Sequence, residues 1–142
     1  MSRSIKEQIK QHFVAIVSLV IAIIALLYTA WCEEETEKNR NVRVAAFEAL
    51  KHLGELQVVT NYAYYQPQSS LGNPMLGWGH VAIVCDMSEL LSDSMKEKAT
   101  KLKTVWSENF QRLETDEKAS DRVTQEIDAS REAVLEIIRK LR

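Results

Sequence analysis

Glycine and proline are scarce in this chain of 142 residues, which has four glycines and two prolines. β-Sandwiches and barrels contain many tight turns that use these two residues, so their scarcity argues against those folds. Both prolines and three of the glycines fall within residues 67–79, PQSSLGNPMLGWG, and this concentration predicts a loop. The rest of the chain is predicted to be all-α.

Cysteine is also scarce. Cys32 and Cys85 are too few for a disulfide framework, and they lack the spacing of a zinc site. They would pair only if the fold brought them together.

Basic residues do not outnumber acidic residues in the larger part of the chain, residues 33–142. Residues 33–142 contain 15 Lys and Arg against 19 Asp and Glu, a formal net charge of −4. The two signs are interspersed and form no basic stripe, so we expect no nucleic-acid partner. The charges are interpreted as solvated helix faces.

Recognisable catalytic motifs are missing as well. Neither cysteine has a histidine in a nucleophilic arrangement, and no serine elbow is present. The glycines of residues 72–79 lack the lysine and hydroxyl of a phosphate-binding loop. We therefore expect neither enzymatic activity nor a bound cofactor.

Metal-ligating residues are few. Glu48, His52 and Glu55 would share one helix face, and His80 with Cys85 could add softer ligands. A di-iron bundle needs Glu and His three residues apart on two helices, whereas Glu48 and His52 are four apart and occur once. We therefore predict no metal site, and interpret His52 as a half-exposed helix residue. If a site exists, its candidate ligands are Glu48, His52 and His80.

The dominant feature is an apolar run of 19 residues, 13–31, FVAIVSLVIAIIALLYTAW, without charge, proline or glycine. At about 1.5 Å per helical residue, it matches the hydrocarbon thickness of a bilayer and predicts one transmembrane helix. Tyr28 and Trp31 stand where a signal-peptidase site needs small residues, and Trp31 makes a lipoprotein site before Cys32 equally poor. The prediction is an uncleaved signal anchor.

Basic residues flank the anchor on both sides, so the orientation is decided by their proximity to it. Those before the anchor are closer, which favours a cytoplasmic amino terminus. Residues 1–12 are thus predicted to be a cytoplasmic tail, 13–31 the anchor, and 32–142 an extracytoplasmic domain. In bacterial terms, the chain would sit in the inner membrane with its domain in the periplasm. The flanking basic residues are Arg3, Lys6 and Lys10 before the anchor, and Lys38, Arg40 and Arg43 after it.

Small residues recur along the anchor at intervals of three and four, which places them on one helix face. Such a face permits close helix packing in lipid, either with a partner span or with a second copy, in which case Cys32 would face Cys32. The alternative is that small residues are common in membrane spans and align by chance. The residues of this small face are Ala15, Ser18, Ala22, Ala25, Thr29 and Cys32.

The soluble part shows helical periodicity in several segments. A helix is predicted over residues 36–66, open to continuity with the anchor and ending before Pro67. The segment from Trp78, with HVAIVCDMSELL, could be a strand and a short helix, or one helix. We predict a helix because a lone strand would have no partner in this chain.

Two further helices complete the predicted domain. One begins at a capping box of Ser94 and Glu97, and a hairpin near residues 114–120 separates it from the last. The result is an antiparallel bundle of three long helices and one shorter helix, standing on the membrane. The predicted core face of the third helix is Met95, Ala99, Leu102, Trp106, Phe110 and Leu113, and that of the last is Val123, Ile127, Ser130, Val134, Ile137 and Leu141.

Aromatic and apolar residues gather on both sides of the loop. Aromatics and methionine are favoured at protein interfaces, so they form a candidate partner-binding surface. Alternatively, they cap the open end of the bundle, with Trp78 packed on Tyr62 and Tyr65. The candidate partner-binding residues are Tyr62, Tyr64, Tyr65, Met75, Leu76 and Trp78.

The plan of one anchor and a helical domain is similar to the periplasmic helical sensor bundles of bacterial receptors. Those receptors have a second span and a cytoplasmic output domain, and this sequence shows neither, so signalling by that route is not expected. The predicted function is a non-catalytic structural or accessory subunit of a membrane complex. Its partners would be the lipid bilayer and another membrane or periplasmic protein, or a second copy. The alternative is a ligand- or metal-sensing bundle.

Overall fold

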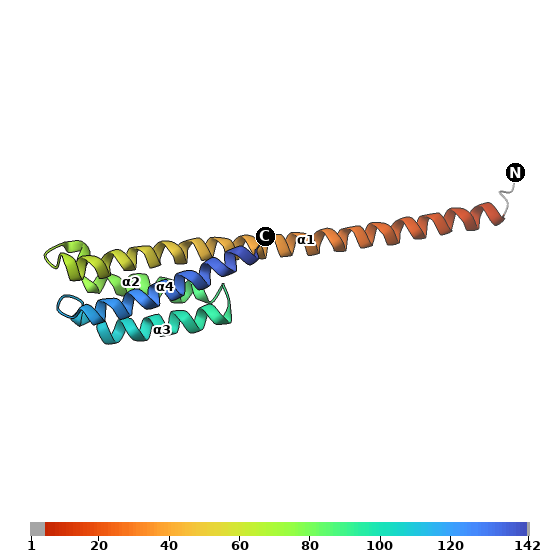
Figure 1. Cartoon of the computed structure of the whole chain (residues 1–142). Helices are drawn as coiled ribbons and strands as arrows, with labels where there is room; N and C mark the ends of the chain where they lie inside the picture. The colour runs from red at the N-terminus through yellow and green to blue at the C-terminus, as the bar shows by residue number, and fades with distance from the viewer. Residues whose placement is uncertain (1–4, 142) are drawn as a thin grey trace. The chain divides into compact units, whose positions relative to one another are not determined.

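The computed structural model describes the backbone of residues 5–141 and the side chains from residue 12 onward. Within residues 5–141 all regular elements are helices and no strand is present, which confirms the all-α prediction and the choice of a helix rather than a strand for the segment from Trp78 (Figure 1). Arg3, one of the residues used to predict the orientation, lies outside the described part. The four α-helices are α1 (Ile5–Tyr65), α2 (Pro74–Ser88), α3 (Asp93–Asn109) and α4 (Glu117–Lys140), with 3-10 turns η1 (Ser70–Gly72) and η2 (Phe110–Arg112).

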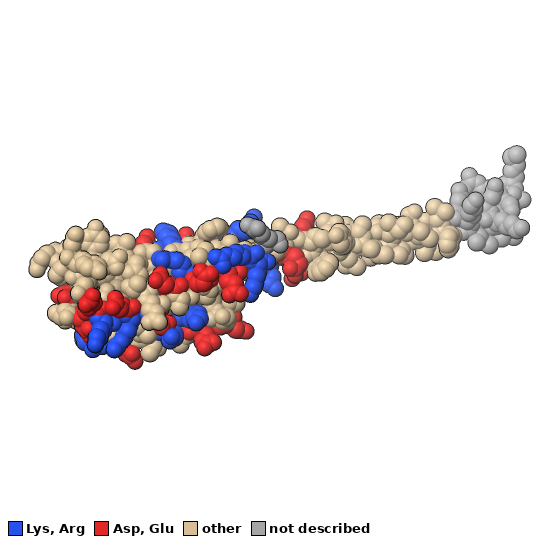
Figure 2. Space-filling model, viewed as in Figure 1, with Lys and Arg blue, Asp and Glu red and all other residues tan. Residues whose placement is uncertain are grey.

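The chain divides into two compact units, residues 1–39 and residues 40–142, and α1 contributes to both. We call them the amino-terminal unit and the helical unit. In the amino-terminal unit every side chain from residue 12 to residue 39 is exposed. This part of α1 is long and apolar enough to cross a membrane, and Figure 2 shows its apolar length without a charged side chain.

The helical unit has one apolar core to which all four helices contribute. Apolar residues at intervals of three and four turn one face of each helix inward, because these positions lie above one another on a helix. The core faces predicted for the last two helices are confirmed except at Leu141, which is only partly buried beyond the end of α4. Trp106 and Ile127 are fully buried, and Phe110 and Ile137 pack at the edge of the core. From α1 the core takes Ala46, Ala49, Leu53, Leu56, Val59 and Ala63.

Two hydrogen bonds show the relative directions of α1 and α4 within the helical unit. Arg43 of α1 donates to the carbonyl of Leu141 at 3.3 Å, and Gln57 donates to the hydroxyl of Thr124 at 3.0 Å, so α1 and α4 run in opposite directions. The end of α4 therefore lies beside the start of the unit. The turn from α1 to α2 lies at the other end of the unit.

The predicted loop over residues 67–79 is too long, because α2 begins at Pro74. Asn73 caps the helix by accepting the backbone N–H of Met75 at 3.0 Å, and Pro74 occupies the first helical position, where proline is well tolerated. Of the three glycines that suggested a loop, Gly72 lies in η1, and Gly77 and Gly79 lie inside α2. Gly77 is there because a Cβ at this position would overlap the ring of Trp106.

The predicted cap of α3 is also wrong by two residues. The hydroxyl of Ser92, rather than that of Ser94, accepts the N–H of Met95 at 3.1 Å, and Ser94 lies in the first turn. The hairpin between α3 and α4 is confirmed as a break in the helix. It lies slightly earlier than residues 114–120, because Asp116 caps α4 by accepting the N–H of Lys118 at 3.0 Å.

Candidate functional site

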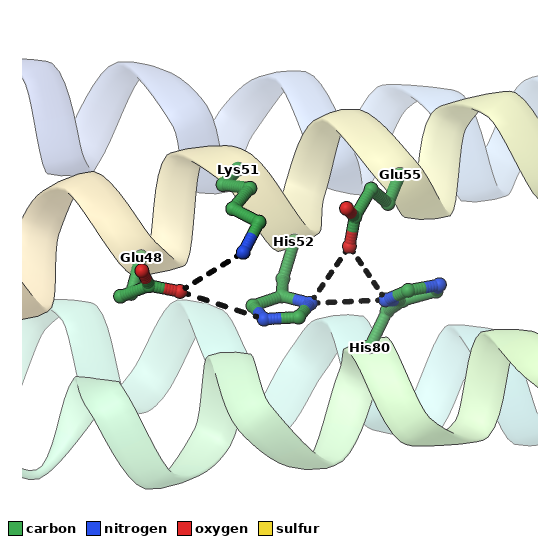
Figure 3. A network of polar contacts seen from close by, with 5 residues as sticks. All are labelled: Glu48, Lys51, His52, Glu55 and His80. Atoms are coloured by element: carbon green, nitrogen blue, oxygen red, sulfur yellow. Dashed lines mark hydrogen bonds and ion pairs between the residues drawn. The ribbon is translucent and has the colours of Figure 1, made fainter.

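A cluster of three ionisable side chains joins α1 to α2 (Figure 3). His52 and Glu55 project from α1 and His80 projects from α2. The Nδ1 atoms of the two histidines are 3.0 Å apart, and Oε2 of Glu55 lies 3.0 Å from Nδ1 of His52 and 3.2 Å from Nδ1 of His80. We call these three residues the His–Glu–His cluster.

Local helical geometry explains why the cluster forms at this place. His52 and Glu55 are three residues apart and therefore point from the same side of α1. Each histidine precedes a buried residue, Leu53 in α1 and Val81 in α2, so both rings lie at the edge of the core. The side chain of His52 is 13% exposed, whereas that of Glu55 is 44% exposed. The cluster is thus closed on the core side and open to solvent at the carboxylate.

Two further charged side chains, Glu48 and Lys51, lie on one side of the cluster. Oε2 of Glu48 lies 3.7 Å from Nε2 of His52, the ring nitrogen that faces away from the cluster, and 3.6 Å from Nζ of Lys51. Burial lowers the pKa of His80 below the ordinary value for histidine, with the carboxylate of Glu55 opposing this effect and His52 adding to it. The environment of His80 therefore favours its neutral form.

No protonation state of the two histidines satisfies all three contacts while Glu55 is ionised. If both Nδ1 atoms carry protons, both donate to Glu55, but two N–H groups then face each other at 3.0 Å. If either Nδ1 lacks its proton, its lone pair faces the carboxylate at 3.0 Å or 3.2 Å. With Glu55 ionised, each of these proton placements therefore leaves one repulsive contact within the cluster.

The candidate ligands named from the sequence are only partly those that the structure brings together. His52 and His80 belong to the cluster, Glu55 supplies its carboxylate, and Glu48 lies on the outer nitrogen of His52. The three-residue spacing of His52 and Glu55 on one helix is the sequence feature that could have identified Glu55 as a candidate ligand. Cys85 takes no part, because its Sγ lies 3.6 Å from the carbonyl oxygen of Ala99, and burial raises the pKa of the thiol.

A second candidate site lies at the turn between α1 and α2, at the end of the helical unit remote from Arg40. Tyr65 is 75% exposed, and Leu71, Met75 and Leu76 are also exposed. Tyr65 also lines a pocket of about 240 Å³, together with Asn61, Tyr62 and Gln66. Of the six residues predicted to bind a partner, Tyr65, Met75 and Leu76 are exposed, and Tyr62, Tyr64 and Trp78 are partly buried.

The alternative packing predicted for Trp78 is wrong. Its ring contacts Phe110 of η2 edge to face, with centroids 5.5 Å apart, rather than the rings of Tyr62 and Tyr65. Tyr65 instead packs against Tyr64, with centroids 4.8 Å apart. The nearby carboxylate of Glu117 raises the pKa of Tyr64 above the ordinary value for tyrosine. Trp78 thus closes the side of the core, and Tyr65 remains available at the surface.

Charge is absent from this end of α1 and α2. No Asp, Glu, Lys or Arg occurs from Leu56 to Cys85, a run of 30 residues that includes the whole turn. Protein surfaces usually carry many charges, so exposed apolar residues within a charge-free segment indicate a candidate interaction surface. Figure 2 shows this uncharged end beside charged residues of the remaining surface. We call the exposed residues Tyr65, Leu71, Met75 and Leu76, with the adjacent pocket, the uncharged tip.

The predicted small face lies on α1 in the amino-terminal unit, with all its members exposed. The hydroxyl of Thr29 donates to the carbonyl of Ala25 at 2.9 Å, so this donor is satisfied within its own helix. Cys32 and Cys85 are both free thiols.

No family model, curated protein or solved structure matches this chain.

Proposed function

We propose that this chain is a single-pass membrane protein whose helical unit forms an antiparallel bundle and binds a partner protein through the uncharged tip. In this proposal it is a non-catalytic structural or accessory subunit of a membrane complex. Residues 13–31 are its signal anchor, and residues 32–142 lie outside the cytoplasm, in the bacterial periplasm.

Membrane anchoring is supported by the exposure of the apolar run in α1. Large side chains such as Leu26 and Trp31 are well over half exposed, and the described structure offers them no protein cover. Leaving such a surface in water is unfavourable by about 25 cal/mol for each Å² of apolar area. A lipid environment removes that cost.

The single observation that carries partner binding is the uncharged tip. Exposed tyrosine and methionine side chains beside a pocket are the composition that protein interfaces favour. The run from Leu56 to Cys85 would also present no charge to be desolvated on binding. An apolar segment of another membrane or periplasmic protein is the partner that such a surface fits.

Site-specific photo-crosslinking tests this proposal. A photoreactive amino acid replaces Met75 at the tip or, as the control, Phe47, which is also exposed on α1 but lies outside the tip. After irradiation of native membranes, we expect one discrete protein adduct from position 75 and none from position 47. The adduct should disappear when Tyr65→Ser and Leu76→Ser are added, since both side chains are exposed and their loss leaves the core intact.

Equal adducts from both positions, or an adduct that survives the two serine substitutions, would refute partner binding at the tip. An absence of protein adducts at position 75 would do the same.

A ligand- or metal-sensing bundle is the second candidate. The specific observation that favours it is the His–Glu–His cluster, which holds three potential ligand atoms within 3.2 Å of one another. This candidate function requires the same membrane anchor, but its binding site would be the His–Glu–His cluster between α1 and α2 rather than the uncharged tip.

A further inference from the structure

We propose that His52, Glu55 and His80 bind one divalent transition-metal ion of the Zn²⁺ class, which links α1 to α2. The inference is independent of partner binding at the tip, and it names a ligand for the second candidate function. It also replaces the expectation from the sequence that no metal site exists.

The spacing of the three ligand atoms fits one metal ion. With metal–ligand distances of about 2.0–2.1 Å, tetrahedral coordination separates two ligand atoms by ~3.3–3.4 Å. The three separations in the cluster are 3.0, 3.0 and 3.2 Å. A small outward movement of the side chains would therefore form three corners of a tetrahedron.

A cation also resolves the conflict between the three polar atoms. Deprotonated Nδ1 atoms and an ionised carboxylate oxygen repel one another, but all three can donate a lone pair to one metal ion. The three atoms that repel one another without a metal ion are therefore the atoms that would coordinate it.

Glu48 supplies the outer contact that a metal-binding histidine commonly has. A histidine that binds metal through one ring nitrogen usually donates the N–H of the other to a carboxylate, which fixes the tautomer. Oε2 of Glu48 lies 3.7 Å from Nε2 of His52, on the side of the ring opposite the cluster. A small rotation would complete the hydrogen bond and leave the Nδ1 lone pair directed at the metal.

The donor set selects the class of metal. Two imidazole nitrogens and one carboxylate suit Zn²⁺ and its transition-metal neighbours, whereas Mg²⁺ and Ca²⁺ prefer oxygen ligands. The exposed side of the cluster, at Glu55, leaves a fourth position for water. We therefore expect the cluster to bind Zn²⁺ and not to bind Mg²⁺.

Binding would stabilise the contact between α1 and α2, because a ligand that binds only the folded form raises its stability by mass action. For a folded unit of this size, Zn²⁺ at 100 times its dissociation constant should raise the melting temperature by about 10 °C or more.

The test uses the full chain in detergent, stripped of metal by a chelator, in a Cys32→Ser and Cys85→Ser background that removes thiol ligands. Titration against a chromophoric Zn²⁺ chelator gives stoichiometry and affinity, and thermal unfolding gives the stabilisation. We expect one Zn²⁺ per chain, the stated rise in melting temperature, and no rise with Mg²⁺.

Variants then locate the site. His52→Gln and His80→Gln should each weaken Zn²⁺ binding by more than about 100-fold, and Glu48→Gln by about 10–100-fold, as is typical of outer partners. The matched control is His12→Gln, which removes a histidine of α1 that lies outside the cluster and should change nothing. Co²⁺ bound to the unsubstituted chain should show the intense visible bands of tetrahedral coordination, a readout independent of any variant's folding.

Absence of Zn²⁺ binding in the unsubstituted chain would overturn the proposal. Binding that persists in the His52→Gln and His80→Gln double variant, or equal stabilisation by Mg²⁺, would overturn it as well. None of these results would affect the crosslinking at position 75, so failure of the metal site and failure of partner binding can be told apart.

Discussion

Gly77 is the residue whose identity the packing of the helical unit most directly requires. It is buried in α2, where a Cβ would overlap the six-membered ring of Trp106. Trp106 is itself fully buried in the core, so its ring has little room to withdraw. Glycine is disfavoured in helices, and its presence here is explained by the close approach of α2 to α3.

Gly77→Ala should destabilise the protein. We expect the free energy of unfolding to fall by about 1–3 kcal/mol, as is usual when a core is overpacked. The matched control is Gly54→Ala, because a Cβ at Gly54 meets nothing within 4 Å and should raise stability by about 0.5–1 kcal/mol. Denaturant unfolding of both variants, followed by circular dichroism, measures the difference. Equal stabilities would show that Trp106 is not held against Gly77.

The sequence predicts the buried side of α3 but misplaces Gly77. Trp106 lies on a clear repeat of apolar residues, and helical periodicity alone puts it inside. Gly77 stands among prolines and glycines, and local composition interprets such a group as a loop. Only the three-dimensional contact with Trp106 distinguishes a glycine that breaks a helix from one that allows two helices to approach.

At the scale of helices, α3 begins where one serine hydroxyl caps it. Ser92 and Ser94 are equivalent as residue types, and the Glu three residues after Ser94 favours it in a sequence pattern. In the structure Ser92 adopts an extended backbone and accepts the N–H of Met95. The start of α3 is set by this hydrogen bond and by the burial of Met95.

Ser92→Ala should therefore lower the free energy of unfolding by about 1 kcal/mol, the usual cost of a lost cap. Ser94→Ala is the control and should change it by no more than about 0.5 kcal/mol, since Ser94 is exposed within the first turn. Both can be measured by the denaturant unfolding used for the glycine variants. A larger loss for Ser94→Ala than for Ser92→Ala would place the cap where the sequence pattern predicts it.

The His–Glu–His cluster shows why a site that spans two helices is hard to predict. The sequence places His52 and Glu55 on one face of α1, because that relation depends on helical spacing alone. Which residue of α2 meets them depends on the turn between the helices. A Cβ at Gly72 would lie only 2.6 Å from backbone atoms of Tyr62 and Ala63, and this close approach helps fix the position of α2 that brings His80 opposite His52.

At the scale of the whole molecule, the proposal assigns a separate role to each unit. The exposed apolar part of α1 would hold the chain in the bilayer, and the helical unit would present the uncharged tip to a partner. The run from Leu56 to Cys85 without a charged residue is visible in the sequence. Which of its residues are exposed, Tyr65, Leu71, Met75 and Leu76 among them, depends on how α1 and α2 fold together.

The composition of the complex released from native membranes by mild detergent tests most directly whether the chain is an accessory subunit bound through the uncharged tip. The chain carries a carboxyl-terminal tag, and is compared with a tip variant (Tyr65→Ser, Met75→Ser and Leu76→Ser). A surface control (Val44→Ser and Phe47→Ser) changes exposed residues of α1 outside the tip. Native mass spectrometry reports the mass and the companions of each.

We expect a particle that contains this chain and a second polypeptide in fixed ratio, lost in the tip variant and kept in the surface control. A chain released alone or only with copies of itself would contradict the accessory-subunit proposal. A companion retained by the tip variant would contradict the assignment of the uncharged tip as its binding surface.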